Sequence, residues 1–144
     1  MKIVVNILPG VFTEDPGLSG QGKRFIFTED FELVSVGGNA QPAHTPGGTH
    51  SGVVTIVREV TANDPFFPNV ERVFQYEATY LFAAFANLPA AVRGGALTAN
   101  GVFPFPSPPT ITFAVTGGTT PFELARGEVT ESGQNGRTRT FDIT

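Results

Sequence analysis

Hydrophobic and polar residues alternate along much of this chain, and a period of two predicts β-strands. The alternation is clearest over residues 24–36 and 73–82. One face of the first segment carries Phe25, Phe27, Glu29, Phe31 and Leu33. One face of the second carries Phe74, Tyr76, Ala78, Tyr80 and Phe82. No segment keeps the 3.6-residue period of an amphipathic helix, so the chain is predicted to be all-β.

Glycine and proline clusters divide the alternating segments into short strands. The predicted strands cover residues 2–8, 24–36, 52–60, 73–82, 91–98, 110–116, 122–130 and 137–143. Residues 39–48 are predicted to form a loop. Residues 103–109 are expected to stay outside the sheet, because their prolines lack the N–H group that a strand ladder needs.

Short strands at regular intervals, without helical crossovers, predict an antiparallel meander. Closure of this meander into a single eight-stranded β-barrel removes the exposed sheet edges. A barrel of this size has room for one small ligand. Among 144 residues there are 14 Phe and no Trp, so we expect one domain whose lumen is lined with phenylalanine.

Charge and composition argue against several partners. The net charge is −4 and the basic residues are scattered, which does not favour a nucleic-acid partner. The longest apolar stretch, residues 81–92, contains Asn87 and Pro89 and is too short to span a membrane. The first residues enter a strand directly and leave no room for a signal peptide. The absence of cysteine excludes thiolate catalysis and agrees with a cytoplasmic location.

Glu29 is the most unusual polar residue in the pattern, because it lies between Phe27 and Phe31 on an apolar face. A carboxylate in such surroundings is costly to desolvate, and this setting is typical of a general acid or base. A β-bulge that reverses the face, or an ion pair with an arginine at the barrel rim, would explain the residue without chemistry.

Arg126 and Asn6 are the other candidate catalytic residues. An inward Arg126 would pair with Glu29 or stabilise a developing negative charge, whereas an outward one would be a surface residue before Gly127. Asn6 lies in a strand of Ile and Val. If it faces inward it orients a substrate oxygen or a water molecule; otherwise it is a polar residue near a strand end.

The predicted substrate-binding residues are the aromatic side chains on the inner faces, namely Phe25, Phe27, Phe31, Phe74, Tyr76, Tyr80 and Phe113. At least one tyrosine is expected to be core packing only. His44 and His50 fall near the predicted loop, which favours solvent exposure over metal binding. No phosphate-binding glycine loop and no metal-ligand spacing is present, so neither a cofactor nor a metal is expected.

Four segments resemble the allene oxide cyclase and dirigent barrel superfamily. They are Gly52-Val53-Val54, Tyr76-Glu77-Ala78-Thr79-Tyr80, Gly95-Ala96-Leu97-Thr98 and residues 113–129. The last contains a Gly117-Gly118-Thr119 turn, then Phe122, and the Ala125-Arg126-Gly127 form typical of dirigent proteins. The resemblance covers the chain from about residue 50 onward.

The resemblance implies a cofactor-free barrel that binds an apolar, reactive intermediate and directs how it closes or couples. It places the segment Phe27-Thr28-Glu29-Asp30 where the cyclases have a water-holding Asn and the dirigent proteins an Asp. It places Asn6 on a first-strand Asn of the cyclases and Arg126 on an arginine of the dirigent proteins. Val4 and Val54 replace a Glu and a Cys of the cyclases, which argues against allene oxide cyclase activity itself.

The leading hypothesis is therefore a cofactor-independent cyclase that holds a hydrophobic, polyketide-like or lipid-like substrate folded in the lumen. Ring closure by cycloaddition is one form of this reaction. Glu29, alone or with Arg126, would polarise a carbonyl or move a proton. Residues 9–22 and 102–109 would cover the mouth. The alternatives are a non-catalytic dirigent-like protein and an apolar ligand carrier. Relatives form dimers and trimers, so self-association into a homo-oligomer is expected.

Overall fold

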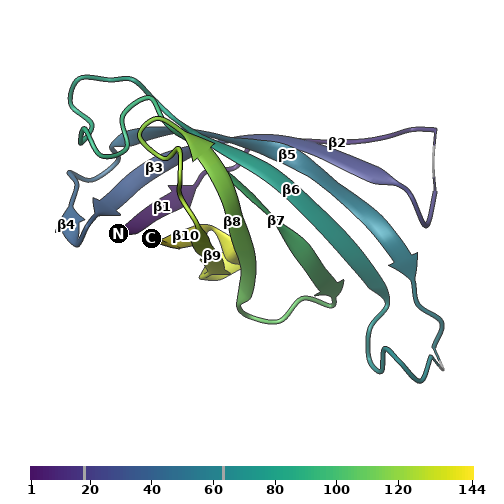
Figure 1. Cartoon of the computed structure of the whole chain (residues 1–144). Helices are drawn as coiled ribbons and strands as arrows, with labels where there is room; N and C mark the ends of the chain where they lie inside the picture. The colour runs from purple at the N-terminus through teal and green to yellow at the C-terminus, as the bar shows by residue number, and fades with distance from the viewer. Residues whose placement is uncertain (18, 63) are drawn as a thin grey trace.

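The computed structural model describes residues 1–17, 19–62 and 64–144. Across these ranges the chain forms ten strands and one short 3₁₀ turn (Figure 1). They are β1 (Lys2–Ile7), β2 (Val11–Glu14), β3 (Arg24–Val36), β4 (Asn39–Ala40), β5 (Pro46–Glu59), β6 (Arg72–Phe82), β7 (Ala96–Phe105), β8 (Ile111–Thr119), β9 (Gly127–Ser132), η1 (Gln134–Gly136) and β10 (Thr138–Ile143).

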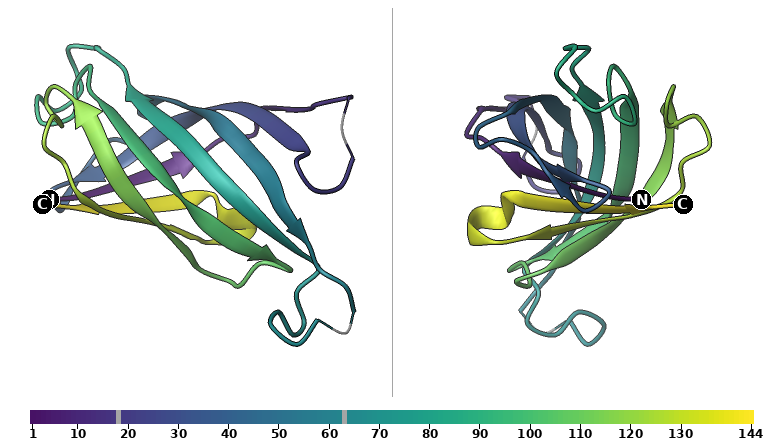
Figure 2. Two further views of the ribbon diagram at one scale, coloured as in Figure 1. Left: turned by 45° about the vertical axis from the view of Figure 1, so that its right-hand side comes forward. Right: turned by 90° about the vertical axis from the view of Figure 1, so that its left-hand side faces the viewer.

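Eight of the strands in the described residues form a closed antiparallel barrel. The strand order is β1-β10-β9-β8-β7-β6-β5-β3, and pairing between β1 and β3 closes the ring. Figure 2 shows the strands tilted around a common axis and, end-on, the ring that they form. The predicted all-β, eight-stranded antiparallel barrel is confirmed.

Strand β3 is long enough to pair with both β1 and β2 along the same edge. β1 pairs with its second half, and β2 pairs with Phe25–Thr28 in its first half. The chain bends between them at Pro9 and Gly10. A Cβ atom on Gly10 would lie 2.2 Å from the carbonyl oxygen of Thr28, so only glycine allows the chain to pass this close to β3. The bend directs β2 along β3, away from β10.

The predicted strands whose bounds differ most from the structure are those of β5, β7 and β9. β5 begins at Pro46 rather than residue 52, β7 covers 96–105 rather than 91–98, and β9 begins at Gly127 rather than residue 122. The expectation that residues 103–105 stay outside the sheet is wrong. Pro104 pairs with Val73 of β6, while β8 pairs with β7 only as far as Asn100. Proline is tolerated because this part of β7 has a partner on one side only.

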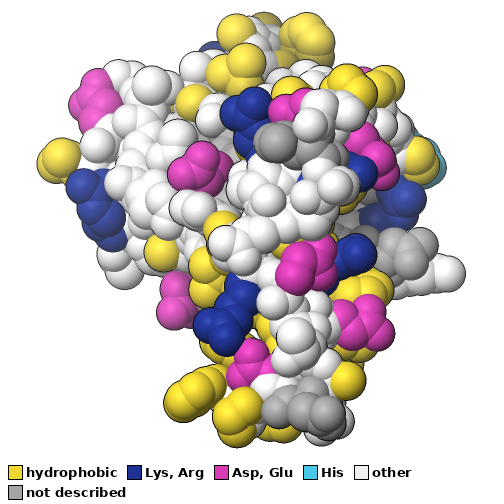
Figure 3. All heavy atoms as spheres, turned by 90° about the vertical axis from the view of Figure 1, so that its right-hand side faces the viewer, with side chains coloured by type: hydrophobic (Ala, Val, Ile, Leu, Met, Phe, Trp, Pro, Cys, Tyr) yellow, Lys and Arg dark blue, Asp and Glu magenta, His cyan; other side chains and the backbone are white. Residues whose placement is uncertain are grey.

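The core lies inside the barrel and follows the alternation of the strands. In β1 the buried residues are Ile3, Val5 and Ile7, and in β10 they are Arg139, Phe141 and Ile143. No helix within the described ranges is long and apolar enough to cross a membrane. On the face that Figure 3 shows, acidic and basic side chains lie among hydrophobic ones, so charge there is mixed rather than grouped by sign.

Candidate functional site

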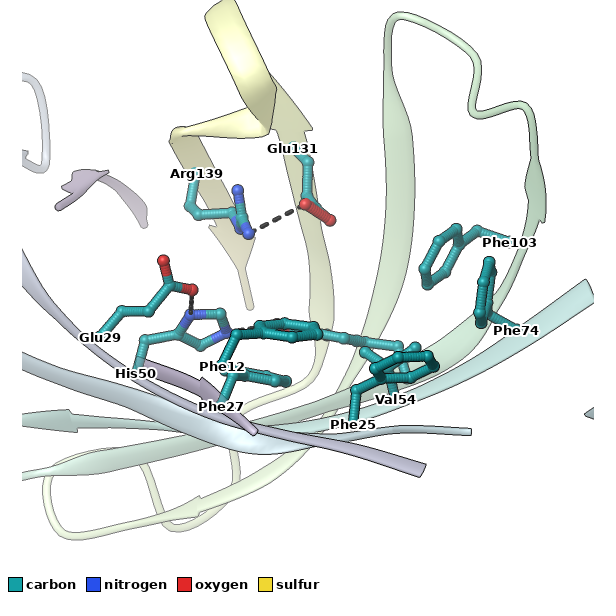
Figure 4. A pocket seen from close by; sticks show the side chains of 11 residues that line it. Phe12, Phe25, Phe27, Glu29, His50, Val54, Phe74, Phe103, Glu131 and Arg139 are labelled. Carbon is teal, nitrogen blue, oxygen red and sulfur yellow. Dashed lines mark hydrogen bonds and ion pairs between the residues drawn. The ribbon is translucent and has the colours of Figure 1, made fainter. Parts of the chain in front are cut away.

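The lumen contains a cavity of about 300 Å³ with aromatic walls and one polar side (Figure 4). Its apolar lining consists of Phe12, Phe25, Phe27, Val54, Phe74 and Phe103. Its polar lining consists of Glu29, His50, Tyr76, Glu131 and Arg139. In Figure 4 Glu29 and His50 face the Arg139–Glu131 pair, while Phe74 and Phe103 lie farther along the cavity.

Strand register brings the polar groups together from distant parts of the sequence. Glu29 of β3 pairs with His50 of β5, which pairs with Tyr80 of β6, so the three side chains form one inward row. Tyr76 lies on the same face of β6, four residues before Tyr80. From the other side of the barrel, Arg139 of β10 pairs with Glu131 of β9. Each residue therefore enters the lumen because of its position in an alternating strand.

The hydroxyl and imidazole groups form a continuous hydrogen-bonded chain. The Nε2 atom of His50 lies 2.6 Å from the Tyr76 hydroxyl, and the two tyrosine hydroxyls are 2.8 Å apart. Arg139 donates from Nε to the Tyr80 hydroxyl at 3.2 Å. At the opposite end, His50 Nδ1 is 3.5 Å from Glu29 Oε1, which is too long for a well-formed hydrogen bond.

At its other end, the hydrogen-bonded chain finishes in an ion pair between Arg139 and Glu131. Arg139 Nη2 lies 2.9 Å from Glu131 Oε1, and both side chains are largely buried. A buried guanidinium needs such a partner, because an unpaired charge away from water is strongly destabilising. The network thus has a carboxylate at each end, Glu29 and Glu131, and both line the cavity.

Burial determines the protonation states in this network. Desolvation lowers the pKa of His50 below its ordinary value, although the nearby Glu29 acts in the opposite direction. Desolvation raises the pKa of Tyr76 and of Tyr80 above the usual value for a phenol. Desolvation also raises the pKa of Glu131, against the effect of Arg139. At neutral pH the imidazole and both phenols are therefore uncharged, while Arg139 carries its charge.

Known structures with the same architecture span nearly the whole chain. No protein-family model matches the sequence, and no curated protein matches it either. The structure is similar to a pyocyanin demethylase, with a TM-score of 0.62, 23% identity, and coverage of 100% of this chain and 98% of that chain. It is also similar to a pterocarpan synthase dirigent protein, with a TM-score of 0.61, 14% identity, and coverage of 99% and 80%.

A second pterocarpan synthase dirigent protein gives a TM-score of 0.58 at 16% identity, with 99% of this chain and 90% of that chain covered. This chain has the dirigent-like barrel fold. The resemblance found in the sequence is confirmed at the level of fold.

Five of the predicted site residues of this dirigent-like barrel line the cavity together, namely Glu29, Phe25, Phe27, Phe74 and Tyr76. Phe27 and Tyr76 are parallel within 3°, with ring centroids 6.0 Å apart. The side chain of Glu29 is 23% exposed, so its carboxylate is accessible to a molecule in the cavity. The alternation in β3 and β6 was sufficient to place these five residues.

Three other predicted residues lie in the core or along its edge, not at the cavity wall. Tyr80 is fully buried and contacts the site through its hydrogen bonds with Tyr76 and Arg139 and by stacking on His50. Phe113 packs behind Tyr76, with ring centroids 4.2 Å apart. Phe31 contacts Tyr80 and Phe82, and lines a separate hollow with Leu8. The sequence pattern placed these residues on the inner face of the sheet, but it did not distinguish residues that line the cavity from residues packed in the core.

For the candidate catalytic residues Arg126 and Asn6, the structure shows the outward alternative in both cases. Arg126 precedes β9, is exposed, and donates from Nη1 to the carbonyl oxygen of Ala125 at 2.7 Å. It does not line the cavity, and the Glu29–Arg126 pair does not form. Asn6 falls on the face of β1 opposite Val5 and Ile7, which are buried, and pairs with Glu32 on the outer face.

Sequence reasoning missed His50, Glu131 and Arg139. His50 was assigned near a loop because of the preceding Pro46-Gly47-Gly48, yet it lies in β5 with 1% of its surface exposed. Arg139 shares the inner face of β10 with Phe141, and Glu131 shares the inner face of β9 with Val129, because in each pair the residues are two apart in an alternating strand. That alternation was visible in the sequence and could have identified both. His44 is exposed and contacts Glu32 at 3.0 Å.

The site offers no set of metal ligands in the described part of the chain. No group of three or more His, Asp or Glu side chains lies close enough together there to hold a metal ion. What the arrangement can do is bind an apolar molecule against phenylalanine rings and present it with an acid–base group and a buried cation.

Proposed function

We propose that this dirigent-like barrel is an enzyme that acts by proton transfer on a flat, hydrophobic small molecule, without a cofactor. The reaction class is ring closure or isomerisation. The observation that carries the proposal is Glu29 beside His50 on one side of an aromatic cavity, with the buried Arg139 facing them.

The cavity walls supply binding and orientation. A volume of about 300 Å³ is at the lower end for ligand sites and suits a compact molecule of two or three fused rings. Aromatic rings such as Phe27 and Tyr76, which are nearly parallel, favour a flat ligand stacked against them. Binding in this shape holds the reacting groups in place, so that the entropy of reaching a reactive conformation is lost at binding.

The polar side supplies the chemistry. The carboxylate of Glu29 removes a proton from the bound molecule, and the negative charge that develops is stabilised across the cavity by Arg139. Return of that proton to a different atom completes an isomerisation. In a ring closure, the carbanion or oxyanion adds to a carbon of a C=O or C=C bond in the same molecule, and the electron pair displaced from that double bond takes the proton back from Glu29. His50 stays neutral and holds Glu29 in position.

One structural neighbour, named a pyocyanin demethylase, supports an enzymatic role, whereas the neighbour named a pterocarpan synthase dirigent protein supports the non-catalytic candidate below. These names make pyocyanin a suitable first probe for the lumen of this protein.

The test is a comparison of Glu29→Gln with Asp30→Asn. Both residues lie in β3, but Asp30 points outward and is exposed. Binding of pyocyanin and of a panel of bicyclic and tricyclic phenols and ketones is measured by calorimetry, and conversion of bound compounds by mass spectrometry. We expect Glu29→Gln to bind but lose at least about 100-fold in turnover, as for loss of a general base, with Asp30→Asn unchanged. Equal turnover in both variants would overturn the proposal.

A non-catalytic role is the second candidate, either as a dirigent-like protein or as a carrier. It is favoured by the fact that the Tyr80 hydroxyl is hydrogen-bonded to both Tyr76 and Arg139, so these polar groups satisfy one another without a substrate. In that case bound compounds leave the protein unchanged. A dirigent role further requires that a product form only when an external oxidant is supplied.

A further inference from the structure

The contacts along the hydrogen-bonded chain in the lumen favour one donor direction. Arginine is a donor at every nitrogen and accepts nothing, so the contact between Arg139 Nε and Tyr80 must end on the oxygen of Tyr80. Within the described residues, the only other polar contact of that hydroxyl is Tyr76, 2.8 Å away. Tyr80 is fully buried, so no solvent takes its proton. The Tyr80 hydrogen is therefore donated to Tyr76.

The same reasoning extends along the hydrogen-bonded chain from Tyr76 through His50 to Glu29. Tyr76 accepts from Tyr80, so its own hydrogen goes to His50 Nε2, 2.6 Å away. A neutral imidazole that accepts at Nε2 carries its hydrogen on Nδ1. That hydrogen faces Glu29 Oε1 at 3.5 Å. Reversing every bond would leave the Tyr80 hydrogen without an acceptor and place the Nδ1 lone pair against a carboxylate.

We propose that Arg139 is a positioning residue that fixes His50 as the Nδ1–H tautomer and leaves Glu29 as the acceptor end of the chain. It follows that the substrate brings an acidic hydrogen or a hydrogen-bond donor to Glu29, as an enolisable ketone or a phenol does. The inference rests on the proposed function for its chemical meaning, but its central test needs no turnover.

The setting of Arg139 suits this role. The residue is 7% exposed and is held by Glu131 at 2.9 Å, so its guanidinium has one orientation. Its charge is permanent, so the donor at Tyr80 does not disappear with pH in the range where the protein works. A lysine at this position would still be able to donate to Tyr80, whereas methionine would not.

The test removes the competing influence of Glu29 first. In Glu29→Gln the side-chain amide both donates and accepts hydrogen bonds, so it no longer selects a tautomer of His50. Only the Arg139 end of the hydrogen-bonded chain then selects one. The tautomer of His50 is read from the ¹⁵N chemical shifts of its two ring nitrogens, at a pH where the imidazole is neutral. We expect Nδ1–H as the single form in the wild type and in Glu29→Gln.

When the hydrogen-bonded chain is broken in the Glu29→Gln background, we expect His50 to lose its preference for the Nδ1–H tautomer. Tyr80→Phe removes the link but leaves the Arg139–Glu131 ion pair intact, so it avoids an unpaired buried charge. Arg139→Met removes the donor itself, and Arg139→Lys is the matched control. We expect Tyr80→Phe and Arg139→Met to shift His50 toward Nε2–H, and Arg139→Lys to retain Nδ1–H. Circular dichroism checks that each variant is folded.

Two results would overturn the assignment. One is Nε2–H in the wild type, and the other is an unchanged tautomer in both chain-breaking variants. If only one of these variants folds, the folded one decides. Since no catalysis is measured, a protein that fails the turnover test above still gives a clear answer here.

The substrate class is tested with a pair of probes that share the naphthalene ring system and differ by one methyl group on the oxygen. 2-Naphthol donates a hydrogen bond and 2-methoxynaphthalene does not. A hydrogen bond to a charged group favours the donor by about tenfold or more in affinity, so we expect 2-naphthol to bind correspondingly tighter to the wild type. Equal affinities would contradict the inference that Glu29 offers the ligand only a hydrogen-bond acceptor, whichever tautomer His50 adopts.

Discussion

At the scale of single residues, the unusual feature is an imidazole shut inside a phenylalanine-rich barrel. His50 is 1% exposed, and its ring lies 4.3 Å from the Tyr80 ring and 4.7 Å from the Phe27 ring, between centroids. In such surroundings the neutral form is strongly favoured, because the charged form loses its hydration. The stability of the fold is therefore linked to the protonation of this one side chain.

The first prediction concerns that linkage. The pKa of His50 is lowered from 6.5 in the folded protein, so the unfolded chain binds a proton at a higher pH than the folded protein does. The free energy of unfolding should fall as the pH drops below about 6.5, by at most about 1.4 kcal/mol per pH unit from this group. Above that pH the contribution is constant.

The measurement is urea unfolding at a series of pH values, comparing the wild type with His50→Gln. The comparison is needed because Glu131, whose pKa is raised, acts in the opposite sense as the pH falls toward 4.5. The wild type should lose more stability than His50→Gln in the acidic range. Parallel pH profiles would show that His50 is not the linked group.

A second prediction concerns Phe12 at the cavity. Its side chain is 60% exposed but stacks on Phe27 with ring centroids 6.1 Å apart. Phe12→Ala should lower the free energy of unfolding by about 0.5–1.5 kcal/mol, the contribution of an aromatic pair. It should weaken 2-naphthol binding about three- to tenfold, since an aromatic contact contributes about 0.5–1.5 kcal/mol. Phe66→Ala, exposed and outside the cavity lining, is the control and should leave affinity unchanged.

At the scale of the strand, the site depends on how closely β5 and β6 approach each other. Gly52 lies in the inward row between Phe27 and Ala78. A Cβ atom added there would lie 2.0 Å from the carbonyl oxygen of Glu77 and 2.8 Å from the Cα atom of Ala78. Backbone atoms cannot move aside as a flexible side chain does, so the pairing of β5 with β6 requires glycine at this position.

We therefore predict that Gly52→Ala destabilises the fold by about 1–3 kcal/mol or more, as overpacking does. Gly117→Ala in β8 is the matched control. Its added Cβ atom would meet nothing closer than 3.7 Å, so the variant should be near neutral. Thermal unfolding of both variants checks this. A Gly52→Ala protein as stable as Gly117→Ala would mean that β5 and β6 can separate without loss.

The strands also show which parts of the site the sequence was able to predict. Alternation placed β3 at Arg24–Val36, as found, and with it Phe25, Phe27 and Glu29. It failed at His50, because Pro46 and Gly48 are turn residues in most settings, and it is pairing with distant strands, β3 for both and also β6 for Gly48, that keeps them in a strand. It failed at Arg126, because a turn at 120–126 delays β9. Contacts between distant strands, such as Arg139 with Tyr80, have no local signal.

At the scale of the whole molecule, the barrel is closed by the first strand. β1 lies between β3 and β10, and the amino group of Met1 bonds to the carbonyl oxygen of Ile143 (Figure 1). The two chain ends therefore lie side by side. The closure that keeps the lumen intact needs β1 in this place, but it does not need β1 to come first in sequence.

We predict that a circular permutant folds if its ends are joined by a short linker and new ends are opened in the exposed loop at Ser107–Pro109. Opening at Glu77, in the middle of β6, should give no folded protein because it cuts a strand that pairs on both sides. Circular dichroism and cooperative unfolding distinguish the two. Folding of the β6 permutant would show that barrel closure does not depend on an intact β6.

The hydrogen-bonded tyrosines give this protein a built-in optical reporter. The chain contains no tryptophan and only two tyrosines, and both are the residues that connect His50 to Arg139. All intrinsic emission above the phenylalanine range therefore arises at the site itself. A ligand that stacks on Tyr76, or a change in the donor to Tyr80, alters the fluorescence of the unlabelled protein, and no other part of the fold contributes a background signal.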